Sequence, residues 1–475
     1  MHTTVFERKF PSSAVVEASL SGTVPRPFWL DDLGPDVVRY PRLDGKLQAD
    51  LVIVGGGYTG LWTALRAKER NPSLDVVVVE AQRLGWAASG RNGGFCEASL
   101  THGYENGKSR WPKELEQLER LGMENLDGIA ETVERYSMDC EFERTGQLNV
   151  AVEPHQLAWL EGDEEGGEFF DQDGVRSLVN SPTYLAGRWF KDDTAMVHPA
   201  KLVAELARVV TELGVRIFEQ SPVTSLEDQA HGVRVESVSG GVTSSVTGKQ
   251  VALGTNVFPS LLKRNSLMTV PVYDYALMTE PLSAEQLASI GWDNRHGIGD
   301  MANQFHYYRL SKDNRILFGG YDAVYYPGRK VKEEYELREE SFAKLASHFF
   351  TTFPQLEGLK FSHKWGGGID SSTQFCAFFG TARKGRVAYA AGFTGLGVGA
   401  TRFAADVMLD LLAGTDTERT RLEMVSKRPL PFPPEPLASI GINLTRWSMD
   451  RADHNEGKRN VILKTLDAVG LGFDS

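Results

Sequence analysis

This chain of 475 residues contains little cysteine. Its three cysteines, Cys96, Cys140 and Cys376, are odd in number and widely separated in the sequence. Such spacing fits free thiols in a reducing compartment better than a disulfide framework or a metal site. We therefore predict a cytoplasmic protein without a bound metal.

The chain also lacks an excess of positive charge and long hydrophobic runs. Its formal net charge of -12 gives no attraction to nucleic acid or to an anionic membrane, so neither is expected as a partner. The first 30 residues contain no signal-peptide core, and no later run approaches the roughly 18 apolar residues of a membrane span. No Ser-His-Asp, paired-carboxylate or metal-ligand pattern has convincing spacing.

What is present is a composition of 41% hydrophobic and 24% charged residues, typical of a globular protein. The most informative stretch runs from Leu51 to Glu80. Four consecutive apolar residues lead into a Gly-x-Gly-x-x-Gly turn, a predicted helix over Tyr58–Arg70 and a second apolar run over Asp75–Val79. This order predicts two parallel strands, buried on both faces, that are joined by a helix.

Each glycine of the turn has a chemical purpose. Gly55 allows a sharp turn, Gly57 lets a pyrophosphate approach the backbone, and Gly60 lets the helix pack close to the strand. Glu80 ends the second strand, where a carboxylate accepts hydrogen bonds from an adenosine ribose. The alternative is an ordinary glycine loop, and the fingerprint alone does not distinguish FAD from NAD.

A second glycine-rich stretch covers residues 84–94, LGWAASGRNGG. Four glycines in eleven residues do not form a stable helix, and they suit a loop folded closely around a bound group. A flexible surface loop would have a similar composition.

These motifs, VGGGYTG at 54–60 and VVVVEAQRLGWAASGRNGG at 76–94, resemble the start of the D-amino-acid-oxidase-like FAD-dependent oxidoreductases. The resemblance extends from about Pro27 to Gly414 and implies FAD as the cofactor. By resemblance, the ADP part of FAD is bound by Gly55, Gly57, Tyr58, Thr59, Gly60, Glu80 and Ala81. The pyrophosphate and flavin are accompanied by Ser89, Gly90, Arg91, Asn92, Gly93 and Gly94, and the adenine by Val223.

The fold implied by the resemblance combines two classes. An α/β, Rossmann-like FAD-binding domain is joined to a second, α+β substrate domain built mainly on an antiparallel sheet. We expect the FAD-binding domain to be discontinuous, with residues 48–105, 195–262 and 360–414, and the substrate or cap domain to comprise 106–194 and 263–359. Residues 1–47 are predicted to be an N-terminal arm and residues 415–475 a C-terminal extension.

The second domain is rich in aromatic residues between 270 and 326, where a strand over 270–278 and a hairpin around 312–314 are predicted. In relatives such a sheet roofs the substrate pocket. Alternation along a strand turns about half of its side chains away from any one face. The candidates for the substrate pocket are Tyr273, Tyr275, His306, Tyr308 and Arg309, of which Arg309 could bind a carboxylate or form a structural salt bridge. His198 precedes a predicted helix and is interpreted as structural rather than catalytic.

The last cofactor segment is a strand, a glycine turn and a helix predicted from about Gly399 to Leu412. By resemblance, its turn contacts FAD through Gly392, Thr394, Gly395, Leu396 and Gly397. The helix N-terminus would then stabilise negative charge on the reduced flavin.

The sequence also departs from the family pattern. Some relatives have a histidine where this chain has Leu396 and a lysine where it has Gly399, so a carboxylate clamp of that type is missing. The positions that carry covalent flavin in relatives hold Ala87 and His363-Lys364, and we therefore predict non-covalent FAD.

The resemblance implies oxidation of an amine or amino acid C-N bond, with hydride passing to the flavin and an imine hydrolysed to a carbonyl compound. The expected partners are a small-molecule amine and O2 or another electron carrier, with the chain a monomer or homo-oligomer. An amine dehydrogenase differs only in the electron acceptor. Two other classes of protein remain as alternatives. One is an NAD(P)H-using flavoprotein, although the sequence has no second Gly-x-Gly-x-x-Gly motif for NAD(P)H, and the other is a non-catalytic flavin-binding subunit.

Overall fold

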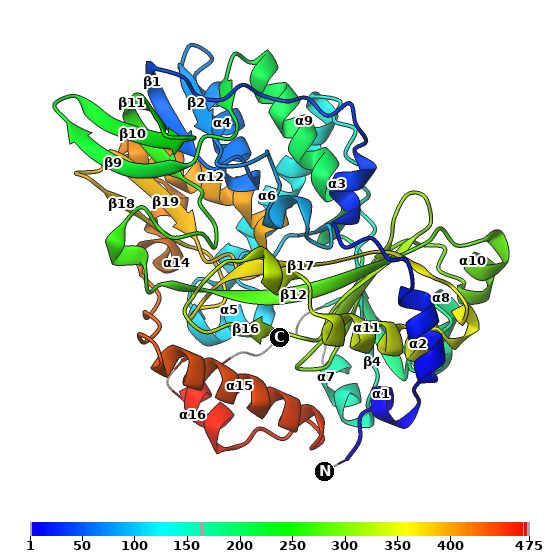
Figure 1. Ribbon diagram of the computed structural model, residues 1–475. Helices are drawn as coiled ribbons and strands as arrows, with labels where there is room; N and C mark the ends of the chain where they lie inside the picture. Colours follow the sequence, from blue (N-terminus) through cyan, green and yellow to red (C-terminus); the bar gives the residue numbers. More distant parts are fainter. Residues whose placement is uncertain (1, 162–165, 469, 473–475) are drawn as a thin grey trace.

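The computed structural model describes residues 2–161, 166–468 and 470–472 (Figure 1). Residues 1, 162–165, 469 and 473–475, which belong to the predicted arm, second domain and C-terminal extension, lie outside the described residues. Two large sheets dominate the fold, as expected from the family resemblance.

The first sheet has a parallel centre. Its strands follow the order β18-β19-β11-β1-β2-β8, with β9 and β10 continuing from β11. Apolar side chains fill both faces of β1 and β2, because helices cover one face and the β9-β10 layer covers the other. The strands are β1 (Lys46–Val54), β2 (Val76–Val79), β8 (Arg216–Phe218), β9 (Val223–Gln229), β10 (Gly232–Ser239), β11 (Val242–Leu253), β18 (Phe378–Ala382) and β19 (Val387–Ala391).

Helices α4 (Tyr58–Arg70), α9 (Pro199–Glu212) and α12 (Gly397–Ala413) gather on one side of this sheet in Figure 1. The predicted helix over Tyr58–Arg70 is confirmed at both ends, since Asn71 and Pro72 stop it before β2. The helix predicted from about Gly399 to Leu412 is also confirmed. It is α12, which begins two residues earlier than predicted.

The second sheet is mostly antiparallel and follows the order β16-β12-β15-β14-β13-β4-β6-β5, with β17 paired along β12. Its strands are β4 (Gln147–Ala151), β5 (Glu168–Phe170), β6 (Ala186–Phe190), β12 (Thr269–Thr279), β13 (Gly297–Asp300), β14 (His306–Leu310), β15 (Ile316–Gly320), β16 (Val324–Tyr325) and β17 (Phe361–Ser372). The hairpin predicted around residues 312–314 is the β14-β15 pair. Helices α7 (Leu157–Leu160), α8 (Gln172–Leu178), α10 (Ala284–Ile290) and α11 (Glu339–Thr352) accompany this sheet.

The structure moves two of the predicted domain boundaries. Helix α6 (Leu115–Arg135) is predicted in the second domain, but its apolar face packs into the core under the first sheet. Strand β17 is predicted in the first domain, but it pairs with β12 over most of its length. The spacing of apolar residues in α6 and β17 shows that each element has a face to bury. It does not show against which of the two sheets that face packs.

The shorter elements complete the chain. The N-terminal arm contains three short helices, α1 (Val5–Arg8), α2 (Ser13–Leu20) and α3 (Phe28–Asp32). The region between the sheets contains β3 (Phe95–Glu97), α5 (Tyr104–Arg110) and β7 (Thr194–Met196). The C-terminal extension forms α13 (Glu418–Arg421), α14 (Glu423–Ser426), α15 (Leu437–Asp453) and α16 (Val461–Ala468).

A buried ion pair locks α12 against α4. Asp406 of α12 accepts hydrogen bonds from Arg66 Nε at 3.0 Å and from Arg70 Nη2 at 2.7 Å. Burial alone would raise the pKa of Asp406, but the two guanidinium groups hold it below its usual value. The carboxylate therefore stays ionised and tied to α4 at neutral pH.

Replacing Asp406 with alanine leaves two guanidinium groups without this partner. We expect Asp406→Ala to lower the free energy of unfolding by about 2–3 kcal/mol at pH 7, less than the 3–5 kcal/mol of fully buried pairs because both arginines are partly exposed. Since the folded pKa is depressed, the loss should shrink as the pH falls through that pKa. Urea unfolding at pH 7 and at pH 3, which lies below the usual carboxyl pKa of 3.8, measures the difference, and equal stability of variant and parent at pH 7 would contradict it.

Candidate active site

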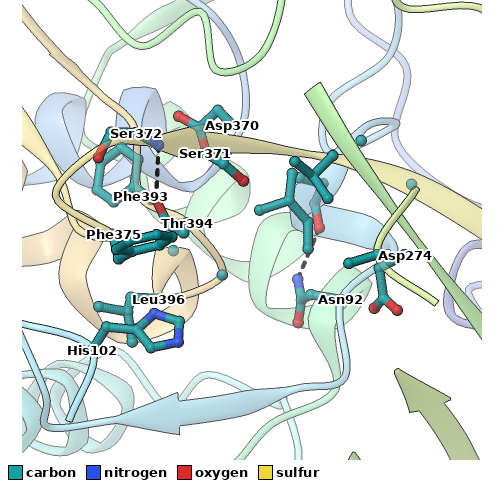
Figure 2. A pocket seen from close by; sticks show the side chains of 18 of the residues that line it. Asn92, His102, Asp274, Asp370, Ser371, Ser372, Phe375, Phe393, Thr394 and Leu396 are labelled. Carbon is teal, nitrogen blue, oxygen red and sulfur yellow. Dashed lines mark hydrogen bonds between the residues drawn. The ribbon is translucent and has the colours of Figure 1, made fainter. Parts of the chain in front are cut away.

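A cavity of about 1770 Å³ is lined by residues of both sheets and of the C-terminal extension. Most small-molecule sites occupy about 300–1,000 Å³, so this cavity has room for more than one group of that size. Figure 2 shows part of it, with residues of the last cofactor segment facing Asn92 and Asp274 across the space.

The glycine turn after β1 borders one end of the cavity. Gly55 has φ of +110°, a conformation that favours glycine, and Gly55, Gly57, Tyr58 and Thr59 line the cavity. Gly60 does not line it: an added Cβ would lie 1.9 Å from the Gly55 carbonyl oxygen. Gly60 thus has the packing role predicted for it. The N-cap residue of α4, Gly57, has no capping side chain, but Ser89 Oγ accepts a hydrogen bond from the N-H of Tyr58, the first residue of the helix, at 3.0 Å.

Glu80 lies at the end of β2 beside this turn. Its carboxylate accepts hydrogen bonds from the backbone N-H groups of Gly56 at 2.6 Å and Gln82 at 2.8 Å and from Trp86 Nε1 at 3.0 Å. Burial raises the pKa of Glu80, and these hydrogen bonds counteract the rise. Glu80 and Ala81 both line the cavity, as does Val223 at the start of β9.

The glycine-rich loop after Glu80 is held by its own polar side chains. Asn92 Nδ2 donates to the carbonyl oxygens of Ala88 and Ser89, both at 3.0 Å, and Asn92 Oδ1 accepts from Gly94 N-H at 2.8 Å. Arg91 Nε donates to Trp86 O at 2.7 Å, and its guanidinium pairs with Glu336. These bonds favour an ordered wall of the cavity over a flexible surface loop.

Ser89, Arg91, Asn92 and Gly93 of this loop line the cavity, whereas Gly90 and Gly94 do not. The two glycines are needed for close packing instead. An added Cβ would lie 2.4 Å from Gly85 O at Gly90 and 2.3 Å from Val197 O at Gly94.

The turn before α12 closes the opposite side of the site. Thr394, Gly395, Leu396 and Gly397 line the cavity, and no side chain caps the N-terminus of α12. Gly392 lies behind them and donates its N-H to Asp370 at 2.6 Å. Burial raises the pKa of Asp370 to about 7, against hydrogen bonds from backbone N-H groups that lower it. The N-terminal ends of α4 and α12 therefore both direct positive partial charge at one cavity.

Gly399 shows why a lysine clamp is missing from this helix. A Cβ at this position would lie 2.1 Å from the carbonyl oxygen of Glu97 in β3. The close contact between α12 and β3 therefore leaves no space for a side chain at residue 399.

The roof over the cavity is formed by β12, β14 and β17. Of the predicted pocket residues, only Tyr275 borders the cavity, and its hydroxyl points to Tyr326 and to Tyr335 O. Tyr273, His306 and Tyr308 belong to the aromatic core on the other face of the sheet. The structure corrects these three assignments, since the strands present the opposite alternation to the cavity.

Arg309 also does not line the cavity. Its guanidinium is buried, donates to Val197 O at 2.6 Å and lies over the ring of Trp29. Arg309 therefore fastens the roof to the first domain and is not a carboxylate binder. His198 is structural as predicted: its Nδ1 accepts from Lys201 N-H at 3.1 Å at the start of α9.

The neighbours of the predicted aromatics face the cavity instead. Asp274 and Tyr307 both line it, and Tyr307 Oη donates to Asp274 Oδ2 at 2.6 Å. Burial raises the pKa of Asp274 to about 6, despite hydrogen bonds from Tyr307 and from the backbone of Tyr275 and Gly320. The ring of Tyr307 touches the glycine loop, 2.8 Å from where a Cβ of Gly93 would lie. Sequence reasoning missed this pair, because alternation along a strand shows which residues share a face but not which face meets the cavity.

Fold and site together place the N-termini of two helices at one cavity, under a roof that carries the carboxylate of Asp274, an arrangement typical of dinucleotide-binding proteins. The chain belongs to the FAD dependent oxidoreductase family, whose model matches residues 50–411. The gamma-glutamylputrescine oxidoreductase of Escherichia coli is 32% identical over 80% of this chain and 87% of that protein. A probable oxidoreductase OrdL of Haemophilus influenzae is 28% identical, covering 82% of this chain and 89% of its own.

Among solved structures, glycine oxidase from Geobacillus kaustophilus has the same fold. Its TM-score is 0.66 at 17% sequence identity, with 81% of this chain and all of the oxidase covered. The predicted family, its FAD cofactor and its two-domain fold class are confirmed, and the chain is an oxidoreductase of a family that includes amine and amino acid oxidases.

Two further observations concern the helices and the cysteines. In the described part of the chain, no helix has the length and apolar character needed to cross a bilayer. Cys96, Cys140 and Cys376 are free and buried.

Tyr307 and Tyr308 are adjacent residues on opposite faces of the roof, so they form a matched pair of variants. We expect Tyr307→Phe to lower substrate turnover at least several-fold, because Asp274 loses a hydrogen bond, while stability changes little. Tyr308→Phe should leave turnover unchanged and lower the free energy of unfolding by about 1 kcal/mol, because it breaks the buried 2.7 Å bond to Tyr184. Steady-state kinetics and urea unfolding of both variants check this. The reverse pattern would contradict the assigned faces.

Proposed function

We propose that this protein oxidises the C-N bond of a small cationic amine with FAD held non-covalently in the cavity. The observation that best supports this proposal is the position of Asp274, whose carboxylate lies on the roof of the cavity. Its hydrogen-bond partner Tyr307 contacts the glycine-rich loop at Gly93. An amine is protonated in neutral water, and a carboxylate in a closed site attracts such a cation strongly.

The residues fit FAD as the cofactor. Gly57 offers backbone without a side chain beside Ser89, and Glu80 lies at the end of β2, where ribose hydroxyls would meet it. The uncapped N-terminus of α12 would favour negative charge on the pyrimidine side of the flavin. When bound, FAD supplies the acceptor for a hydride from the carbon next to the substrate nitrogen.

The state of the cationic side chains around the cavity favours an amine substrate over an α-amino acid, which would bring a carboxylate of its own. Among the described residues that line it there is no lysine, and each lining arginine already has a partner. Arg91 pairs with Glu336, Arg446 with Asp322 and Arg459 with Asp467, while Arg188 donates to backbone carbonyls near Leu160. A substrate carboxylate would have to compete with these partners.

The chain's own groups prepare the substrate for oxidation. Asp274 holds the ammonium group by an ion pair and accepts the proton that must leave before the nitrogen lone pair can assist loss of hydride. Tyr307 orients the carboxylate, and the hydrogen bonds within the loop at residues 89–94 hold this wall of the site in a fixed position. The imine product is then hydrolysed by water to a carbonyl compound and an amine or ammonia.

Exchanging Asp274 for asparagine keeps the shape and removes the charge. We expect Asp274→Asn to lower kcat/KM for a primary amine at least about 100-fold. The unmodified protein should lose kcat/KM as the pH falls below about 6, because protonation of Asp274 removes its attraction for the ammonium group, and the variant should lose this acidic limb. Asp313→Asn, in the exposed β14-β15 turn, is the control and should match the parent. Unchanged kinetics in Asp274→Asn would refute the role of this carboxylate.

The residues at the two positions where relatives attach flavin support a flavin that is not covalently bound. Ala87, at one position where relatives attach flavin, lines the cavity without a nucleophile, and His363 lies on β17 against Phe28 and Asp31. Acid precipitation should therefore release the yellow colour into the supernatant. Colour retained in the protein pellet would show a covalent bond.

An anaerobic screen of primary amines, N-methyl amines, amino acids and polyamine derivatives tests the function as a whole. Loss of the flavin absorbance with an amine supports the proposal. Bleaching by dithionite but by no amine would instead favour a non-catalytic flavin-binding subunit, and bleaching by NADPH would favour a pyridine-nucleotide enzyme.

We further propose O2 as the electron acceptor and the cytoplasm as the location, the latter supported by the three free thiols. Repeating the reaction in air should give one hydrogen peroxide per amine oxidised. Flavin that an amine bleaches but air does not restore would instead point to an electron carrier.

A further inference from the structure

The C-terminal extension forms part of the wall of the cavity. The family model ends at residue 411, before the extension begins. Helices α15 and α16 nevertheless contribute to the lining, and Figure 1 shows them beside β16 below the second sheet. This wall is therefore an addition to the part of the chain that matches the family.

The extension is attached by specific polar contacts to loops that join strands of the second sheet. Asp453 at the end of α15 accepts hydrogen bonds from Asn303 N-H at 2.9 Å and Gln304 N-H at 3.1 Å. Arg446 donates to Asp322 Oδ1 at 3.1 Å. Burial alone would raise the pKa of Asp322, but Ser341, Lys344 and two arginines hold it below its usual value, so this anchor is ionised at neutral pH.

The polypeptide that leads to α15 is also attached. Thr373 Oγ1 donates to Leu430 O at 2.7 Å, and Phe432 N-H donates to Leu267 O at 2.8 Å. Arg329 Nη2 donates to Pro433 O at 2.7 Å. Both the leading segment and α15 are thus attached to residues beside the cavity.

The face of α15 that lines the cavity is mainly apolar. Ala438, Ile442, Thr445 and Met449 lie on one side of the helix at spacings of four, three and four residues, and all line the cavity. Ile462 and Leu466, one turn apart on α16, line the same region. Ile440, by contrast, is 60% exposed on α15 and does not line the cavity.

Together these observations describe a cavity with two chemically different regions. The region under the roof carries Asp274, and the region under the extension presents aliphatic side chains from α15 and α16. We propose that the extension forms a binding subsite for an apolar group, so that the preferred substrate is an amine with a long alkyl or arylalkyl chain. This rests on the proposed amine oxidation, in which Asp274 receives the nitrogen.

The subsite predicts how affinity depends on chain length. Each methylene transferred from water into an apolar wall should tighten binding up to about fourfold, until the subsite is filled. Calorimetric titration of the FAD-loaded protein under anaerobic conditions with n-propylamine, n-butylamine, n-hexylamine and n-octylamine measures this directly. Binding that does not depend on chain length would overturn the proposal.

Two isoleucines of the same helix provide matched variants. Ile442→Asn places a polar amide in the lining and should remove most of the gain per methylene, while the affinity for n-propylamine stays within about twofold. Ile440→Asn makes the same exchange on the exposed face and should leave the whole series unchanged. Equal effects of the two variants would overturn the proposal, because a general disturbance of α15 affects both.

A third variant covers the case in which Ile442→Asn does not fold. Thr445→Trp fills the subsite instead of exposing a polar group, and it should weaken n-octylamine binding at least tenfold with little change for n-propylamine. Unfolding temperature and flavin absorbance establish that each variant is intact. No selective loss for the longer amine would count against the subsite.

The flavin absorbance in the same samples separates the two proposals. Binding that increases with chain length without bleaching of the flavin would leave the subsite standing and reject amine oxidation. Bleaching by all amines at affinities independent of length would retain amine oxidation and reject the subsite.

Discussion

The site depends on how closely the N-terminal ends of two helices approach neighbouring backbone. At Gly60 of α4 and Gly399 of α12, a Cβ would lie 1.9 Å and 2.1 Å from a backbone carbonyl oxygen. Only glycine allows this approach, and it brings both helix N-termini to the cavity. The ion pairs of Asp406 with Arg66 and Arg70 then fix α12 to α4, so the two ends move as one unit. An anionic cofactor can be held there without any cationic side chain of the two helices.

The parts of this arrangement that follow from local sequence could be predicted. The strand-turn-helix unit at 51–80, the glycine roles at Gly55 and Gly60, and the helix after residue 397 all appear in the structure, because turn chemistry and helix ends are set by neighbouring residues. The loop after Glu80 could be placed by resemblance, and the bonds of Asn92 explain why it is ordered.

Contacts between distant segments could not be predicted in the same way. Along β12 and β14, a shift of one residue exchanges the cavity face for the core, and the aromatics Tyr273 and Tyr308 belong to the core. Their neighbours Asp274 and Tyr307 line the cavity instead. Likewise, the periodicity of α6 and β17 shows that each has an apolar face but not which sheet it meets. The wall formed by α15 depends on Asp453 and Arg446 finding partners at Gln304 and Asp322, which no spacing in the sequence reveals.

The central claim is that a substrate ammonium group binds at Asp274, under the roof and over the flavin. A crystal structure of the FAD complex with tert-butylamine tests it most directly, because this amine has no hydrogen on the carbon next to nitrogen and remains unoxidised. The account predicts the nitrogen within hydrogen-bond distance of the Asp274 carboxylate, with its carbon against the flavin. An ammonium group bound to another carboxylate of the cavity, such as Asp300, or a flavin placed away from the N-terminus of α12, would contradict it.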